Sequence, residues 1–160
     1  MCANVRNCYL PSSKVRALDV FLALSSHLTD EAKLDRMVPY IVDLLQDDAA
    51  IVRAAALRTL MQVLMLVTVI TPSNAAIFPE YIIPAIAHLV RDSDVLVRCM
   101  YAQVIVPLAD TAVRYLEMGQ ALKAHGTYKA LPDAQEYDEA HFEVRPLRLS
   151  RPRIFTQSGS

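Results

Sequence analysis

Glycine is almost missing from this sequence, since the 160 residues contain only three glycines and none lies between residues 12 and 118. A loop that cradles phosphate groups needs glycine, because glycine lets several backbone N–H groups approach the ligand closely. Nucleotide binding of that kind is therefore excluded for this stretch. The HRD, DFG, GxSxG and HExxH motifs of kinases, serine hydrolases and zinc peptidases are also absent. We expect no catalytic residue and no cofactor.

Cysteine and histidine are sparse as well. The three cysteines, Cys2, Cys8 and Cys99, form no CxxC pair, so neither a disulfide framework nor a zinc site is indicated, and a reducing compartment fits best. The four histidines have no partner at ligand spacing, and we expect no bound metal. Cys99 follows Arg98 near an expected helix start, where a thiol can become reactive. Packing as a small apolar residue is the interpretation that we favour.

An excess of charge and long apolar runs are absent too. The formal net charge is -1 and the sequence pI is about 6.4, so no general attraction to nucleic acid or to an anionic membrane is expected. The longest apolar run, residues 60–70, falls short of the roughly 18 residues that a membrane span requires. We therefore predict no membrane insertion and a cytoplasmic location.

An internal repeat is what the sequence does contain. Shifting residues 37–67 by 45 positions aligns the following pairs: Pro39/Pro84, Ile41/Ile86, Leu44/Leu89, Asp47/Asp92, Val52/Val97, Arg53/Arg98 and Leu60/Ile105. A period of 40 to 47 residues with two apolar helical segments is typical of HEAT repeats. The sequence thus predicts an all-α fold, a HEAT-type α-solenoid of antiparallel helix pairs with about two and a half repeats.

The repeat also predicts the boundaries and the core. The expected parts are an irregular segment 1–11, a partial repeat 12–28, a repeat 29–70, a repeat 78–118 and a tail 119–160. The tail holds five acidic side chains in residues 133–143 and four arginines in residues 145–153, a composition that favours disorder. The apolar and proline residues of the aligned pairs form the predicted repeat core: Pro39, Ile41, Leu44, Val52, Leu60, Pro84, Ile86, Leu89, Val97 and Ile105. We also predict a bend or restart at Pro39 and a kink at Pro107.

Four charged residues stand out because they recur at equivalent helix starts: Asp47, Arg53, Asp92 and Arg98. With one Asp and one Arg in each unit, the Asp of one unit can face the Arg of the next and form a charge-assisted ladder. In that arrangement Asp47 pairs with Arg98, and the role is structural. A basic row that binds a ligand is the alternative, for which two arginines are too few.

Three stretches carry a family resemblance: LDRMVPYIVDLLQD, VRAAALRTLMQVLMLV and FPEYIIPAIAHLVRD. They resemble the HEAT-repeat region of the large regulatory (p150, protein-kinase-like) subunit of the class III phosphatidylinositol 3-kinase complex. The resemblance implies a scaffold in autophagy and endosomal sorting, with the lipid-kinase catalytic subunit and a beclin-type adaptor as partners on endosomal and autophagic membranes. The kinase-like domain of that subunit has no counterpart here. Pro107 and the residues after Gly119 depart from the family pattern.

Two further function hypotheses stand beside the scaffold. One is a HEAT adaptor of another system, such as a phosphatase scaffold or a transport receptor. The other is enzymatic, and it depends on a kinase domain that this chain lacks. Because the first helical unit has no partner helix, Val15, Leu18 and Phe21 are expected to remain partly exposed. The isolated chain is therefore expected to self-associate.

Overall fold

The computed structural model describes residues 10–124 and residue 126. Within this part of the chain there are five helical segments, one short 3-10 turn and no β-strand. The all-α prediction is confirmed. Residues 1–9 of the expected irregular segment 1–11 and most of the expected tail 119–160 lie outside the described residues.

The first two helical segments differ in how they begin. Helix α2 spans Pro11–Ser25, with Pro11 in its first turn, where a missing N–H costs nothing. The next segment consists of α3 (Asp30–Ala32), the π-helical turn η1 (Lys33–Met37) and α4 (Val38–Leu44). Thr29 caps it, because its Oγ1 accepts a hydrogen bond from the Ala32 N–H at 3.3 Å.

A π-helical turn precedes each of the two repeated prolines. In η1 the Val38 N–H donates to the Lys33 carbonyl, one residue before Pro39. The second turn, η3 (Phe78–Ile82), lies 45 positions later and ends in the same way before Pro84. Proline cannot donate to the carbonyl four residues back and its ring crowds that carbonyl. A wider turn at this point relieves both problems, so the predicted restart at Pro39 takes the form of a π turn.

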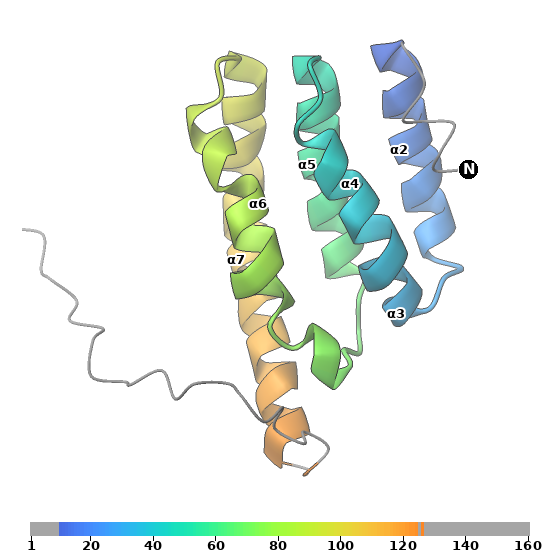
Figure 1. Cartoon of the computed structure of the whole chain (residues 1–160), viewed down its shortest axis with the longest axis vertical. Helices are drawn as coiled ribbons and strands as arrows, with labels where there is room; N and C mark the ends of the chain where they lie inside the picture. Colours follow the sequence, from blue (N-terminus) through green and yellow to red (C-terminus); the bar gives the residue numbers. More distant parts are fainter. Residues whose placement is uncertain (1–9, 125, 127–160) are drawn as a thin grey trace, which may run out of the picture. The chain divides into compact units, whose positions relative to one another are not determined.

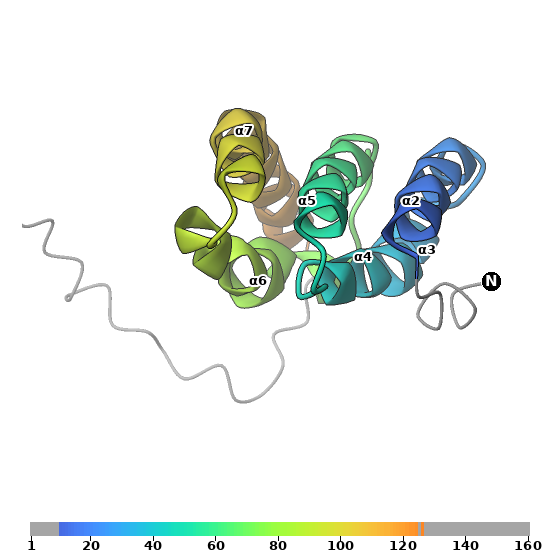
Figure 2. The same cartoon turned by 90° about the horizontal axis from the view of Figure 1, so that it is seen from above.

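The remaining helices complete two helix pairs. Helix α5 spans Ala50–Met65, and a 3-10 turn, η2 (Pro72–Asn74), follows it. Segment η3 continues into α6 (Ile83–Ala87) and the 3-10 turn η4 (His88–Arg91), and α7 spans Val95–Ala124. Figure 1 shows α2, α5 and α7 side by side, and Figure 2 shows them in one layer with α3, α4 and α6 in a second. Helix α5 packs against both α2 and α7.

The core is centred on α5, which is covered on both sides. The predicted core residues Val52 and Leu60 are fully buried, and so are Ala56, Val63 and, just after the helix, Val67. Ile41, Leu44, Ile86, Leu89 and Val97 are also buried, and Pro39 is half-buried. Two predicted core residues are exposed instead. Pro84 and Ile105 lie on the side of α6 and α7 that no described helix covers.

Helix α7 extends beyond the expected end near Met118. It continues through Gly119 to Ala124, and Gly119 lies close to the loop after α5, since a Cβ there would be 3.5 Å from the Ala75 Cβ. The helix also continues through Pro107, whose carbonyl accepts a hydrogen bond from the Thr111 hydroxyl at 2.7 Å. The kink at Pro107 stays a prediction.

By length and composition alone, α7 could cross a membrane, so the expectation that no segment reaches that length is corrected. One such helix is weak evidence, because core helices of water-soluble proteins pass the same test. In this chain α7 packs along α5, and it carries Asp110, Arg114 and Glu117 within its length. We interpret α7 as a packing helix.

Candidate functional site

The two helix pairs are joined by an ion pair between Arg53 and Asp92. Arg53 stands in the first turn of α5, and Asp92 stands in the loop between η4 and α7. The guanidinium donates two hydrogen bonds to the carboxylate, from Nε to Oδ2 at 2.8 Å and from Nη2 to Oδ1 at 2.7 Å. The side chains are 14% and 7% exposed. Such a bidentate, charge-assisted contact fixes both distance and orientation between the elements that it joins.

Backbone groups hold Arg53 in place before it meets the carboxylate. Its third nitrogen, Nη1, donates to the carbonyls of Asp47 at 2.8 Å and Asp48 at 3.0 Å. The hydrogen bond to Asp92 raises the pKa of Arg53, against an opposing effect of burial and with support from the charges of Asp92, Asp94 and Asp47. The guanidinium is therefore pre-positioned for an acidic partner.

The surroundings of Asp92 favour its charged form. The hydrogen bonds from Arg53 lower the pKa of Asp92, while burial works in the opposite direction. The backbone N–H of Asp94 donates to Asp92 Oδ1 at 2.9 Å and adds to the lowering. The carboxylate is held in its charged form, which is the form that makes the ion pair with Arg53.

The direction of the ladder is opposite to the predicted one. Asp47 does not pair with Arg98; it forms an ion pair with Lys14 of α2. The two bridges thus run from Lys14 to Asp47 and from Arg53 to Asp92, each from the cation of one unit to the Asp of the next. Asp47, Asp92 and Arg53 take part in these bridges, but Lys14 supplies the cation of the first one, and sequence spacing could not tell which neighbour each residue faces.

A second polar cluster, missed by sequence reasoning, ties the start of the first helix pair to the loop after α5. Asp30 Oδ2 accepts hydrogen bonds from the Thr68 N–H, the Thr68 hydroxyl and the Val69 N–H, each at 2.9 Å. Asp30 Oδ1 accepts from Lys33 Nζ at 2.7 Å. Burial alone would raise the pKa of Asp30, but these hydrogen bonds hold that pKa well below its usual range.

The C-terminal carbonyls of α5 receive donors from α7. Arg114 Nη2 donates to the carbonyls of Leu64 at 3.1 Å and Met65 at 3.0 Å. The Tyr115 hydroxyl donates to the Leu64 carbonyl at 3.2 Å, and burial raises the pKa of that hydroxyl. A cation at a helix C-terminus satisfies free carbonyls and opposes the negative end of the helix dipole. These contacts fix α7 against α5 at the end opposite to Arg53.

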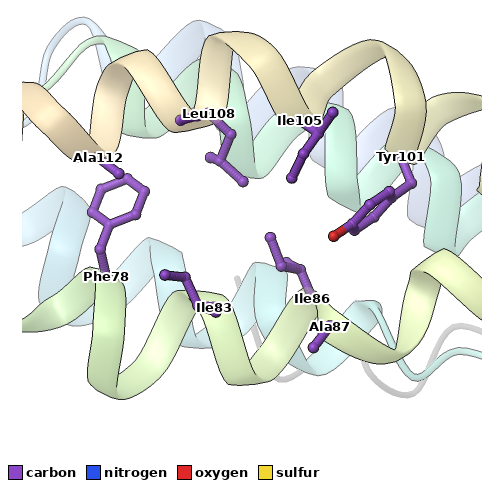
Figure 3. Close-up of a pocket in the computed structure, with 9 residues that line it drawn as sticks. Phe78, Ile83, Ile86, Ala87, Tyr101, Ile105, Leu108 and Ala112 are labelled. Atoms are coloured by element: carbon purple, nitrogen blue, oxygen red, sulfur yellow. The ribbon is translucent and has the colours of Figure 1, made fainter. Parts of the chain in front are cut away.

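An apolar hollow of about 320 Å³ lies between the last two helices. Figure 3 shows its walls, with one side from the η3–α6 segment and the other from α7. Its lining residues are Phe78, Ile83, Ile86, Ala87, Tyr101, Ile105, Leu108, Ala109 and Ala112. Ile83 is 52% exposed and Ile105 is 36% exposed. The hollow could receive an apolar group from another segment.

Cys99, near the start of α7, is exposed, so its expected packing as a small apolar residue is wrong. Among the residues that the structure describes, no three His, Cys, Asp or Glu side chains gather in a way that could hold a metal ion. The polar groups at hand make hydrogen bonds and ion pairs between helices. Chemically, the arrangement can join helices and present a face to a partner.

Comparison with known proteins places the chain in a family. The model of the PIK3R4-like middle domain matches residues 1–151. This match reaches well past Gly119 and corrects the expectation that the residues after Gly119 depart from the family.

Relatives are found in yeast, plant and amoeba. The chain is 40% identical over 123 residues to the putative serine/threonine-protein kinase VPS15 of Komagataella pastoris, which covers 76% of this chain and 9% of the relative. It is 42% identical over 116 residues to the serine/threonine-protein kinase VPS15 of Arabidopsis thaliana, covering 72% of this chain and 8% of the relative. It is 38% identical over 119 residues to the probable serine/threonine-protein kinase vps15 of Dictyostelium discoideum, and this match covers 72% of this chain and 6% of the relative.

The chain therefore spans less than a tenth of the length of these relatives. The word kinase in their names describes the whole proteins, while the family match is to the middle domain alone. The chain belongs to the family of the PIK3R4-like middle domain, a segment of the regulatory subunit of the class III phosphatidylinositol 3-kinase.

Proposed function

We propose that this chain is a non-catalytic scaffold segment that takes part in assembling a class III phosphatidylinositol 3-kinase complex. In this proposal the helix pairs are HEAT-type units of an α-solenoid, and their outer faces bind protein partners. The partners that the family suggests are the lipid-kinase catalytic subunit and a beclin-type adaptor. The segment would then act in autophagy and endosomal sorting, in the cytoplasm and on the surface of endosomal and autophagic membranes.

One observation supports the scaffold most strongly: the same unit occurs twice, in the same internal geometry. The π turns begin at Lys33 and Phe78, and the anchored arginines are Arg53 and Arg98, each pair separated by the 45-residue period. In a solenoid each unit contacts only its neighbours, and the ion pair from Arg53 to Asp92 is a contact of that kind. Stacked units of this type expose long surfaces, which suits assembly better than catalysis.

Electrostatics and family membership favour protein partners over other classes. A net charge of -1 offers no general attraction to nucleic acid. The family match speaks against the alternative of an adaptor from an unrelated system. The names of the relatives refer to a kinase, but they describe the whole proteins, and we assign no kinase activity to this segment.

Affinity capture with purified proteins tests this function. The chain is immobilised and exposed to the class III lipid-kinase catalytic subunit and the beclin-type adaptor, separately and together. We expect at least one to be retained. A Leu60→Ala variant is the matched control, because loss of its buried side chain loosens α5 and should weaken retention. The scaffold proposal would be refuted if neither partner were captured, or if a support without the chain captured both partners equally well.

A further inference from the structure

The second helix pair covers one side of the first pair. Helix α7 packs along α5, and Arg53 of α5 forms the ion pair with Asp92. In the other layer, the Nε2 atoms of Gln46 and His88 are 3.1 Å apart, which brings the end of α4 next to η4. Figure 2 shows the two layers, with α5 and α7 in one and α4 and α6 in the other. Both helices of the first pair therefore have a neighbour on this side.

The corresponding side of the second pair is open. Three aliphatic positions of the first pair have aliphatic counterparts 45 residues later, so their exposure can be compared directly. The residues of the first pair are each 0% exposed: Val38, Leu45 and Leu60. Their counterparts are 52%, 50% and 36% exposed: Ile83, Val90 and Ile105. No helix within residues 10–124 lies on the far side of α6 and α7, and this missing neighbour explains the difference.

The charged group of this side is also without its neighbour. Arg98 Nη1 donates to the carbonyls of Asp92 and Ser93 at 2.7 and 3.0 Å, and Arg53 Nη1 donates to the carbonyls at the equivalent positions. Nε and Nη2 of Arg53 then bind the Asp92 carboxylate. For Arg98, no carboxylate within residues 10–124 accepts from these two nitrogens. Two parallel N–H donors match a carboxylate in shape and charge. Arg98 is thus pre-positioned for a carboxylate of a partner.

The two ion pairs between units indicate where that carboxylate should lie. Asp47 lies in the loop between α4 and α5, and it binds Lys14 of the preceding helix α2. Asp92 lies in the loop between η4 and α7, and it binds Arg53 of the preceding helix pair. In both cases the acceptor is an Asp in the loop between the two helical segments of the next unit. A partner that continues this interface carries a carboxylate in such a loop.

We propose that the α6–α7 face binds a helical protein partner of this chemistry. Two consecutive helices of the partner place aliphatic side chains against Ile83 and Ile105, over the hollow that Figure 3 shows, and the loop between them places a carboxylate on Arg98. The inference rests on the proposed scaffold function and assigns it a surface. In a second copy of the chain the equivalent carboxylates, Asp47 and Asp92, are already bound. A different protein therefore fits the face better.

Binding measurements on the full chain test the apolar part of the face. The probe is the purified class III lipid-kinase catalytic subunit bound to its beclin-type adaptor, and its affinity for the immobilised chain is measured by interferometry. Ile83→Asp puts a charge into the hollow and should weaken binding by about tenfold or more. Val20→Asp on α2 is the matched control, because Val20 is 45% exposed, and it should change the affinity by less than about twofold. Val90→Ser replaces Ile83→Asp if that variant lowers the urea midpoint.

Cross-linking tests the carboxylate. Arg98→Lys keeps the positive charge and puts a primary amine at this position. A water-soluble carbodiimide joins that amine to a carboxylate in contact with it, forming an amide while the carbodiimide takes up the water and becomes a urea. We expect mass spectrometry to find a cross-link to an Asp or Glu in a loop between two helices of the probe. The Lys14–Asp47 pair is the internal positive control, and Arg16→Lys on the exposed side of α2 is the negative control.

The outcomes separate this inference from the scaffold function. If the probe binds the unaltered chain and Ile83→Asp equally and no cross-link forms at position 98, the inference is overturned while the scaffold function stands. If the probe does not bind the unaltered chain, both are overturned. Cross-links from position 98 to a second copy of the chain overturn the inference and assign the face to a dimer. Flotation of the unaltered chain, but not of Ile83→Asp, with phosphatidylcholine vesicles overturns it in favour of a lipid surface.

Discussion

The ion pair between Arg53 and Asp92 gives the sharpest stability prediction, because its geometry is known at both ends. A double-mutant cycle with Arg53→Ala, Asp92→Ala and the double variant isolates the pair from the other contacts of each residue. Arg53 also donates to two backbone carbonyls, and that loss occurs in the single and in the double variant, so it cancels. What remains is the coupling between guanidinium and carboxylate.

The magnitude follows from the contacts and their burial. Two charge-assisted hydrogen bonds at 2.8 and 2.7 Å join side chains that are 14% and 7% exposed. Hydrogen bonds to charged groups contribute about 1.5 to 3 kcal/mol each in proteins, and desolvation removes part of that gain. We expect a coupling of about 2 to 3 kcal/mol in the free energy of unfolding, measured by urea denaturation at neutral pH.

A second ion pair in the chain serves as the control. Arg58 and Asp19 join α5 to α2 through one bond at 3.3 Å, with side chains 46% and 58% exposed. Exposed pairs of this kind contribute less than about 1 kcal/mol, so the same cycle should give about 0 to 0.5 kcal/mol. If the two cycles give equal couplings, or if Arg53 and Asp92 are strictly additive, the bridge between the helix pairs does not stabilise the fold as argued.

Three other predictions follow from packing, capping and ionisation. Leu60→Ala should lower the free energy of unfolding by about 2 to 5 kcal/mol, since its side chain is fully buried; an unchanged urea midpoint would show that α5 is not covered on that face. Tyr115→Phe removes the hydrogen bond to the Leu64 carbonyl and should cost about 0.5 to 1.5 kcal/mol, whereas Tyr115→Leu also loses the ring contact with Phe78 and should cost more; a Tyr115→Phe variant that melts like the unaltered chain would argue against the hydroxyl, and equal costs of the two variants would argue against the ring contact. The pKa values of Asp30 and Asp92 are lowered by folding, so their contribution is present above the unfolded pKa of about 3.9 and is lost as pH falls through the folded values. Urea midpoints should therefore fall steeply below about pH 4, and Asp30→Asn should flatten that profile; an unaltered slope would contradict the assignment.

Helices, their order and most of the core could be predicted from the sequence because periodicity reports burial directly. Leu60 and Leu89 are examples, since each sits on an apolar stripe and each is fully buried. Ile105 and Pro84 show where this fails. A position in a repeat is buried only where a neighbouring unit covers it, and no described helix lies beyond α6 and α7 to cover these two residues. Leu18 is the opposite case, because it was expected to be exposed but is buried where α2 packs against α5.

The polar contacts were harder to predict, because they depend on how helices are placed in space. Asp47 and Asp92 were found from their spacing, but their partners Lys14 and Arg53 depend on which unit lies next to which face. The contact of Asp30 with the loop at Val69 joins residues 39 positions apart through backbone N–H groups. Almost every residue carries a backbone N–H, so the amino-acid sequence does not show which of them will act as a donor to a distant side chain. No spacing rule could have found this contact.

Isothermal titration calorimetry with two titrants tests the scaffold function most directly. The chain in the cell is titrated with the class III lipid-kinase catalytic subunit bound to its beclin-type adaptor, and in a parallel run with Mg-ATP. The account predicts saturable binding of the protein complex and no heat of binding from Mg-ATP. Saturable binding of Mg-ATP together with no binding of the protein complex would contradict it.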